Sequence, residues 1–297
     1  MHIVCFEATM HADLDTLCTV VYCTAADLLP EARRNARRKL SDAEVVTLCV
    51  AQAIMGIPSD RRFLATARRQ IGHLFPVLPS QSAYFKRRRR LAAALEWLMA
   101  VFASDSPGFH DDLLLVDSTP VECARSRETV KRSALAEVAD YGWCASHSRW
   151  FWGFRLHTLC ALDGTPRAFT LASPKRDERE VCLELLDRTA HGREVLVCDK
   201  GYAGRDFALA AAERGVLVVR PRRKDEPGKG PHLAPIRQRI ESVFWSCKDL
   251  LTLERHGART VAGLRERILA RFLCLTACIS LNHRLGRASR ALVDYAA

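Results

Sequence analysis

The sequence lacks several features that would place it in a specialised class of protein. None of its 12 cysteines forms a C-x-x-C pair, which argues against a zinc ribbon or zinc finger. Its longest apolar stretches, residues 45–57 and 268–281, are shorter than a membrane span, and Arg271 interrupts the second. The N-terminus has no basic segment followed by a long apolar one, so we expect no secretion signal and no membrane partner.

A disulfide framework is also not expected. Most of the cysteines lie inside apolar runs, and the chain is long enough to bury a sizeable core without cross-links. We therefore interpret the cysteines as buried thiols, which are typical of the reducing cytosol. This interpretation predicts a cytoplasmic protein.

What the sequence has in excess is positive charge. The 297 residues include 45 Lys and Arg against 34 Asp and Glu, which gives a net charge of +11, and 48% of the residues are hydrophobic. The hydrophobic content predicts a globular chain with one large or two modest domains. The charge favours a polyanionic partner, most simply nucleic acid, although a solvated basic surface is the alternative.

Residues 1–108 are predicted to be helical. Ser41 and Glu44 occupy capping-box positions just before the apolar run at residues 45–54. Basic clusters recur at residues 33–34, 37–39 and 86–90. The last cluster lies on a helix predicted to begin at Ser80 or Ser82 and to continue to residue 102. Such clusters are usually solvated faces, but here they predict a helix–turn–helix-like contact with DNA through three residues of the last cluster: Lys86, Arg87 and Arg88.

The pattern changes to strands after residues 104–112. Short apolar runs predict strands, helical patterns separate the later ones, and Asp163-Gly164 predicts a hairpin. The order β-β-β-α-β-α-β, followed by a long helix, is the ribonuclease H-like order. We therefore predict an α/β fold in which helices flank a mixed sheet at residues 109–285, with a short tail at residues 286–297. The predicted strands are residues 113–116, 151–162, 166–172, 195–198 and 216–219.

Two of these strands end in an aspartate. Asp117 follows LLLV and Asp199 follows VLVC, and the ribonuclease H-like order makes these two strand tips neighbours. Paired carboxylates raise each other's pKa unless a cation lies between them, and their hard oxygens suit Mg²⁺ or Mn²⁺. The alternative is that each aspartate only caps a turn, as the sequence Asp117-Ser118-Thr119-Pro120 allows.

The long helix predicted from about residue 235 to residue 251 offers a third acid. At 100° per residue, Arg237, Glu241 and Lys248 fall within about 40° of one another beside an apolar face. The alternative is an exposed ion pair of little consequence. Lys200, next to the second aspartate, is either a phosphate contact or a solvated turn residue. His157, on a predicted strand, is better explained as a core histidine than as a catalytic one.

Two further groups are compatible with DNA binding. Arg220, Arg222, Arg223 and Lys224 precede a Gly/Pro-rich loop and are able to meet phosphates. A set of four aromatic residues is able to stack on an unpaired base, although burial under the sheet explains them equally well. The set comprises Tyr141, Trp143, Trp150 and Trp152.

Taken together, the motifs resemble a known family. Asp117 lies in VDSTPV, Asp199 begins DKGY, and the long helix fits R-x3-E-x6-K. The segments FWGFRLHTLCALDGTPRAFTLASPKRDERE and FPVLPSQSAYFKRRRR are similar to the same family. Over nearly its whole length the chain resembles the DDE transposases of bacterial insertion sequences, and among them the group numbered nine hundred and eighty-two. One departure is Ala234, where the family signature often has tyrosine.

The resemblance implies a site and partners. Asp117, Asp199 and Glu241 would be the catalytic residues and would bind two Mg²⁺ or Mn²⁺ ions, while Arg237 and Lys248 would hold DNA phosphates. The substrates would be double-stranded terminal inverted repeats and target DNA, brought together by a homodimer or larger assembly in the bacterial cytoplasm, at the nucleoid. Two alternatives stay open. One is a metal-dependent nuclease of the same fold without joining activity, and the other is an inactive DNA-binding relic.

Overall fold

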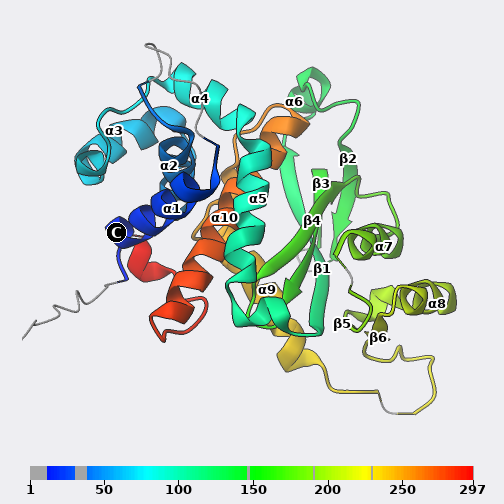
Figure 1. The fold of residues 1–297 in the computed structure, drawn as a ribbon. Coiled ribbons are helices and arrows are strands. Elements are labelled where there is room, and N and C mark those ends of the chain that lie inside the picture. Colours follow the sequence, from blue (N-terminus) through cyan, green and yellow to red (C-terminus); the bar gives the residue numbers. More distant parts are fainter. Residues whose placement is uncertain (1–11, 31–38, 146–147, 190, 229, 297) are drawn as a thin grey trace, which may run out of the picture.

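A curled mixed sheet, covered by helices on both faces, lies beside a group of N-terminal helices (Figure 1). The computed structural model describes residues 12–30, 39–145, 148–189, 191–228 and 230–296. The basic residues at positions 33, 34, 37 and 38 lie outside these described residues. The structure therefore has the predicted fold class, a mixed α/β sheet flanked by helices together with an N-terminal helical region.

The N-terminal helices begin at polar caps. Ser41 and Glu44 form the predicted capping box, and the Ser80 side chain accepts a hydrogen bond from the N–H of Ala83. The predicted helix at residues 80–102 is in fact two helices, separated at Leu91. The reason is that the first helix packs on its N-terminal neighbours whereas the second packs on the last long helix of the chain. The five helices are α1 (Leu14–Leu28), α2 (Asp42–Ile54), α3 (Asp60–Gln70), α4 (Gln81–Arg90) and α5 (Ala92–Ser104).

The sheet has six strands. They are β1 (Leu113–Ala124), β2 (Asp140–Cys144), β3 (Arg149–Ala161), β4 (Pro166–Ala172), β5 (Val195–Val197) and β6 (Leu217–Val219). Strand β1 is central, antiparallel to β3 and parallel to β5, and β5 is parallel to β6. With β4 paired to β3, the order β4-β3-β1-β5-β6 is the predicted ribonuclease H-like order. The sequence reasoning predicted neither the short strand β2 nor helix α6 (Arg127–Arg132), and it missed the long helix α10 (Val261–Arg284) as well.

Strand β1 is much longer than predicted. It continues to Ala124 because β3 pairs with it along its whole length, from Leu114 to Ala124. Pairing with β5 stops at Leu115, so the β5 side of β1 has no strand partner beyond this point. Pro120, which has no N–H to donate, is tolerated in this half-paired stretch. Asp117 is therefore inside a strand and not at a strand tip or in a turn, and that prediction was wrong.

Side-chain alternation along the strands separates two cores. Leu114, Val116 and Leu196 pack with α7 (Glu178–Thr189) and α8 (Arg205–Glu213). Leu115 and Val197 belong to the larger core on the opposite face, which includes α9 (Ala234–Lys248), α10 (Val261–Arg284) and the N-terminal helices. In this larger core α10 packs against α2 and α5, so the N-terminal helices and the C-terminal half of the chain share one core (Figure 1).

Two sequence expectations can be checked against these cores. Most of the described cysteines are buried and none is in a disulfide, although Cys23 is exposed and Cys123 is half-buried. Across the described residues, no helix is long and apolar enough to cross a membrane.

Candidate active site

The end of the β1–β5 ladder brings the two aspartates together. Leu115 and Val197 form the last pair of this parallel ladder, and Asp117 and Asp199 each lie two residues further on. Because side chains alternate along a strand, each aspartate is directed to the same face as the residue two positions before it, which is the face covered by α9 and α10. The predicted proximity of the two acids thus follows from strand register and not from strand ends.

The backbone after β5 holds the Asp199 carboxylate in place. Its Oδ1 accepts a hydrogen bond of 2.6 Å from the backbone N–H of Gly201 and caps the 3₁₀ turn Lys200–Tyr202. A Cβ atom at position 201 would lie 2.7 Å from Asp199 Oδ1, closer than real contacts allow. A side chain at position 201 would therefore displace the Asp199 carboxylate from its present place.

The Asp117 carboxyl is in an unfavourable environment for a negative charge. The pKa of this carboxyl is raised to about 7, mainly by burial and in addition by the negative charges of Asp199 and Glu178. The hydrogen bond from the backbone N–H of Ser118 and the positive charge of Arg237 act in the opposite direction. A cation placed beside Asp117 would relieve this repulsion.

Helix α9 presents the third predicted acid on the same face. Glu241 lies one turn after Arg237, and their side chains form an ion pair of 3.7 Å. The side chain of Glu241 is 57% exposed, whereas that of Arg237 is 27% exposed and acts on Asp117. Arg237 thus interacts with both Glu241 and Asp117. Lys248, near the end of the helix, pairs instead with Glu254 at 3.6 Å.

The donor set fits a divalent metal ion in chemistry but is not gathered around one point. Carboxylate oxygens are the ligands that Mg²⁺ and Mn²⁺ prefer, and two neighbouring carboxylates, Asp199 and Glu178, contribute to the raised pKa of Asp117. In the part of the chain that the structure describes, however, no three His, Cys, Asp or Glu side chains lie close enough together to hold a metal ion. Asp117 and Asp199 would form the core of such a site, while Glu241 is paired with Arg237.

Sequence reasoning missed a cluster beside Asp117 that involves Glu178. The Glu178 carboxylate accepts a 2.7 Å hydrogen bond from the Ser118 hydroxyl and lies 3.0 Å from Arg155 Nη1. Arg155 also donates to Ser118 Oγ and to the backbone carbonyl of Trp143. These bonds connect β1, β2, β3 and α7 next to Asp117. Glu178 stands in the charged run KRDERE, where nothing in the residue pattern separates it from its neighbours.

The aromatic set divides into exposed and buried members. Tyr141, Trp143 and Trp150 are exposed, and the rings of Trp143 and Trp150 meet edge to face with centroids 5.5 Å apart. Trp152 is buried. Burial therefore explains Trp152, whereas the three exposed residues remain available for stacking on a base.

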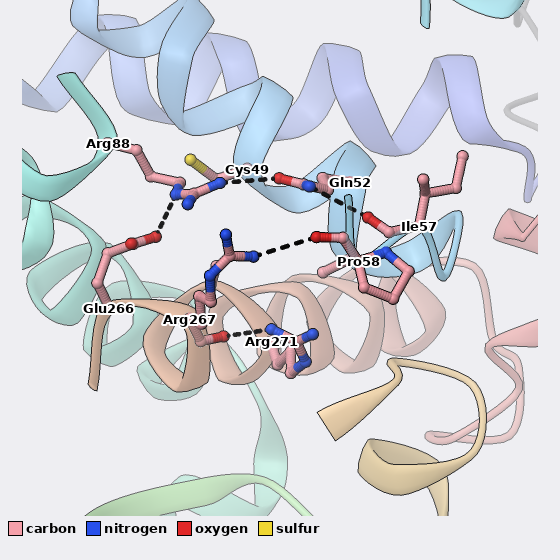
Figure 2. A pocket seen from close by; sticks show the side chains of 10 residues that line it. Cys49, Gln52, Ile57, Pro58, Arg88, Glu266, Arg267 and Arg271 are labelled. Atoms are coloured by element: carbon pink, nitrogen blue, oxygen red, sulfur yellow. Dashed lines mark hydrogen bonds and ion pairs between the residues drawn. The ribbon is translucent and has the colours of Figure 1, made fainter. Parts of the chain in front are cut away.

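The basic cluster on α4 is only partly at the surface. Lys86 is exposed, and Arg87 is paired with Asp42 and the Leu40 carbonyl. Arg88, predicted to contact DNA, is only 2% exposed, with its guanidinium between Asp60 at 2.9 Å and Glu266 at 2.5 Å. Figure 2 shows Arg88 directed toward Glu266 of α10. The prediction for Arg88 is corrected: it binds α3 and α10 and cannot reach a phosphate.

His157 is a core residue, as the sequence favoured. It is 1% exposed, and burial lowers its pKa to about 4. Neither ring nitrogen has a hydrogen-bond partner among the described residues.

Comparison with known proteins gives a family match. The family model described as "Transposase DDE domain" matches residues 108–277, which is more than half of the chain and includes all three acids. No curated protein matches the chain. A solved structure titled "Cryo-EM structure of piggyBac transposase synaptic complex with hairpin DNA (SNHP)" is similar at 8% identity and a TM-score of 0.42, over 92% of this chain and 79% of that one.

Proposed function

Because the chain belongs to the transposase DDE domain family, whose members cleave DNA and transfer the cut strand, we propose that it moves a bacterial insertion sequence. It would cut DNA at the terminal inverted repeats of the element and join the cut ends to target DNA. We place it in the insertion-sequence group numbered nine hundred and eighty-two, on the strength of the DKGY motif at residues 199–202 and the R-x3-E-x6-K pattern of α9.

A single observation carries the site assignment. The β1–β5 register puts Asp117 and Asp199 at equivalent positions on one face, and the pKa of Asp117 is raised partly by Asp199. We therefore assign Asp117, Asp199 and Glu241 as the catalytic and metal-binding residues. The family uses divalent metal ions, and we propose two Mg²⁺ or Mn²⁺ ions here. Bound ions would activate the attacking oxygen and stabilise the leaving oxygen of an in-line displacement.

The residues of the chain supply position and charge. Asp117 and Asp199, fixed by the sheet and by the Gly201 N–H, provide oxygens at defined places. Arg237 is close enough to act on Asp117, so it is placed to hold a phosphate of the reacting strand once Glu241 releases it. Glu178 acts as a positioning residue, because it holds Ser118 and Arg155 beside Asp117.

Other basic residues would bind DNA further from the reacting bond. Lys200 is exposed beside Asp199, and Lys248 lies on the same helix as Arg237. Lys86 and Arg87 on α4 would contribute to binding of the element end by the N-terminal helices. Figure 1 shows α4 well apart from β5, so a duplex would have to be long enough to span this separation to reach both. A homodimer or larger assembly would bring two ends together.

Cleavage and joining of DNA from the flanks of the gene test this proposal. We expect the purified chain with Mg²⁺ to cut these duplexes and to join a precleaved 3′ end to a plasmid. Asp117→Asn, Asp199→Asn and Glu241→Gln should abolish both steps and weaken Mg²⁺ binding in calorimetry, whereas Asp249→Asn, an exposed acid just after α9, should not. Full activity of Asp199→Asn would overturn the assignment, and cleavage without joining would favour a nuclease.

A further inference from the structure

An open cavity of about 750 Å³ lies beside the second aspartate, and its lining is basic. It is enclosed by the turn before α8, the end of β6 and the loop that follows β6. Four arginines and one glutamate contribute to its wall: Arg205, Arg220, Arg222, Arg223 and Glu226. Building on the function proposed above, we propose that this cavity, the β6 pocket, binds the sugar–phosphate backbone of a DNA strand that passes Asp199.

The charge of the pocket is not neutralised by the protein. Glu226 is already engaged, because Arg220 binds it through two hydrogen bonds of 2.6 and 2.9 Å. Arg205, Arg222 and Arg223 form no ion pair with any carboxylate in the described ranges, and all three are exposed. Three guanidinium groups around one concave surface attract phosphates, and each can bind a phosphate in bidentate fashion.

The pocket is a built structure and not a chance gathering of loop arginines. The Arg220–Glu226 pair closes the loop after β6, and the same carboxylate accepts a 2.9 Å hydrogen bond from the backbone N–H of Arg223. Gly230 allows the returning chain to approach Arg222 closely, since a Cβ atom there would lie 2.7 Å from Arg222 Cγ. These contacts fold the loop on itself, with Arg222 and Arg223 in the wall of the cavity.

The start of α8 adds to the attraction for anions. Arg205 is its first residue, and Gly204 before it provides no side-chain cap for the first N–H groups. Free N–H groups at a helix start and the helix dipole both favour a negative group. This feature reinforces the arginines and is not needed to define the site.

A hydrogen bond connects the pocket to the catalytic region. Arg223 Nε donates to the backbone carbonyl of Lys200 at 3.2 Å, and Lys200 follows Asp199 directly. A DNA strand bound by Arg223 would therefore lie next to Lys200, the residue that follows the second acid. In Figure 1 the loop after β6 lies at the edge of the sheet furthest from the N-terminal helices, so the β6 pocket is separate from the contact proposed for α4.

The salt dependence of DNA binding tests this proposal. Each phosphate contact contributes about 0.9 to the slope of log K against log salt concentration. We expect Arg222→Ala and Arg223→Ala each to lower that slope by about 1 with a 40-bp duplex of arbitrary sequence, and we expect Arg222→Lys to retain it. Arg193→Ala is the matched control. It removes an exposed arginine just before the opposite end of β5 and should leave the slope unchanged.

The source of the bound strand is decided by comparing two probes, a duplex from the flank of the gene and an unrelated duplex. If Arg222→Ala and Arg223→Ala lower the salt slope only with the flanking duplex, the pocket binds the element end. If they lower the slope equally with both duplexes, the pocket binds target DNA or any strand. Unchanged slopes in folded Arg222→Ala and Arg223→Ala would overturn the proposal even if the wild type cleaves DNA. A wild type that binds with the expected slope but never cleaves would leave the pocket standing and contradict the proposed catalysis.

Discussion

Asp117 and Asp199 occupy equivalent positions relative to the β1–β5 ladder, each two residues beyond its last pair, Leu115 and Val197. The two carboxylates thus come together through backbone pairing that does not depend on either acid. Replacing one acid should leave the pairing intact, so variants of these residues should keep the fold and report on the charge and chemistry of the site.

The first prediction concerns stability and pH. The folded-state pKa of Asp117, about 7, lies above its ordinary value of 3.8, so the folded chain binds this proton more tightly than the unfolded chain between these pH values. Stability from this group is therefore full below about pH 4 and is lost as the pH rises to 7. Without divalent ions, Asp117→Asn should be more stable than the wild type at pH 8, by on the order of a few kcal/mol, and equal to it near pH 4.

Urea unfolding at the two pH values measures this difference, and the exposed residue Asp249 provides the control variant Asp249→Asn. Added Mg²⁺ should stabilise the wild type at pH 8 and have little effect on Asp117→Asn. Equal stability of the wild type and Asp117→Asn at pH 8 would contradict the raised pKa.

The second prediction concerns Glu178, and it tests the effect of its negative charge on Asp117. Glu178→Gln keeps the shape of the side chain and an acceptor for Ser118 but removes a negative charge that raises the pKa of Asp117. The acidic limb of the pH–rate profile should therefore move to lower pH, and the maximal rate should fall. Glu184→Gln, on the same helix but paired with Arg176, should move neither. A Glu178→Gln profile that overlays the wild type would remove Glu178 from the site.

The third prediction concerns Arg88. Its replacement by alanine removes the ion-pair partner that buried Glu266 has among the described residues and leaves buried Asp60 with Arg267 and Gln52 alone, which should cost about 3–5 kcal/mol in the free energy of unfolding. Arg89→Ala removes an exposed neighbour that stacks on Phe85 and should cost far less. Chemical unfolding compares the two. If Arg88→Ala were as stable as the wild type but bound DNA more weakly, the sequence-based assignment would be right after all.

The fourth prediction concerns His157, whose folded-state pKa of about 4 lies below its ordinary value of 6.5. The unfolded chain therefore takes up this proton first, and the histidine lowers stability as the pH falls from 6.5 toward 4. His157→Leu removes two buried nitrogens without partners, so it should stabilise the chain, and more at pH 5 than at pH 7. Activity should be retained, whereas His232→Leu, at an exposed position, should change neither property. Loss of DNA cleavage in a stable His157→Leu would indicate a catalytic role instead.

Patterns of neighbouring residues in the sequence predicted much of the fold but less of the candidate site. The hairpin at Asp163-Gly164 and the capping box at Ser41 depend on neighbouring residues only, and both are present as predicted. The length of β1 was missed because it depends on pairing with β3, which a short apolar run does not reveal. Arg88 was misplaced for a related reason. Its acidic partner Glu266 comes from α10, far along the chain, so a run of four arginines gave no sign that one of them is buried.

The packing of α10 also bears on how the chain is made. Helices α2 and α5 complete their core only with α10, which is translated long after them. A nascent chain on the ribosome therefore carries an open apolar surface on its first helices until residues 261–284 have emerged. A premature stop codon before this point would leave those helices without their partner, and the product would be an aggregation-prone fragment and not a shorter DNA-binding protein.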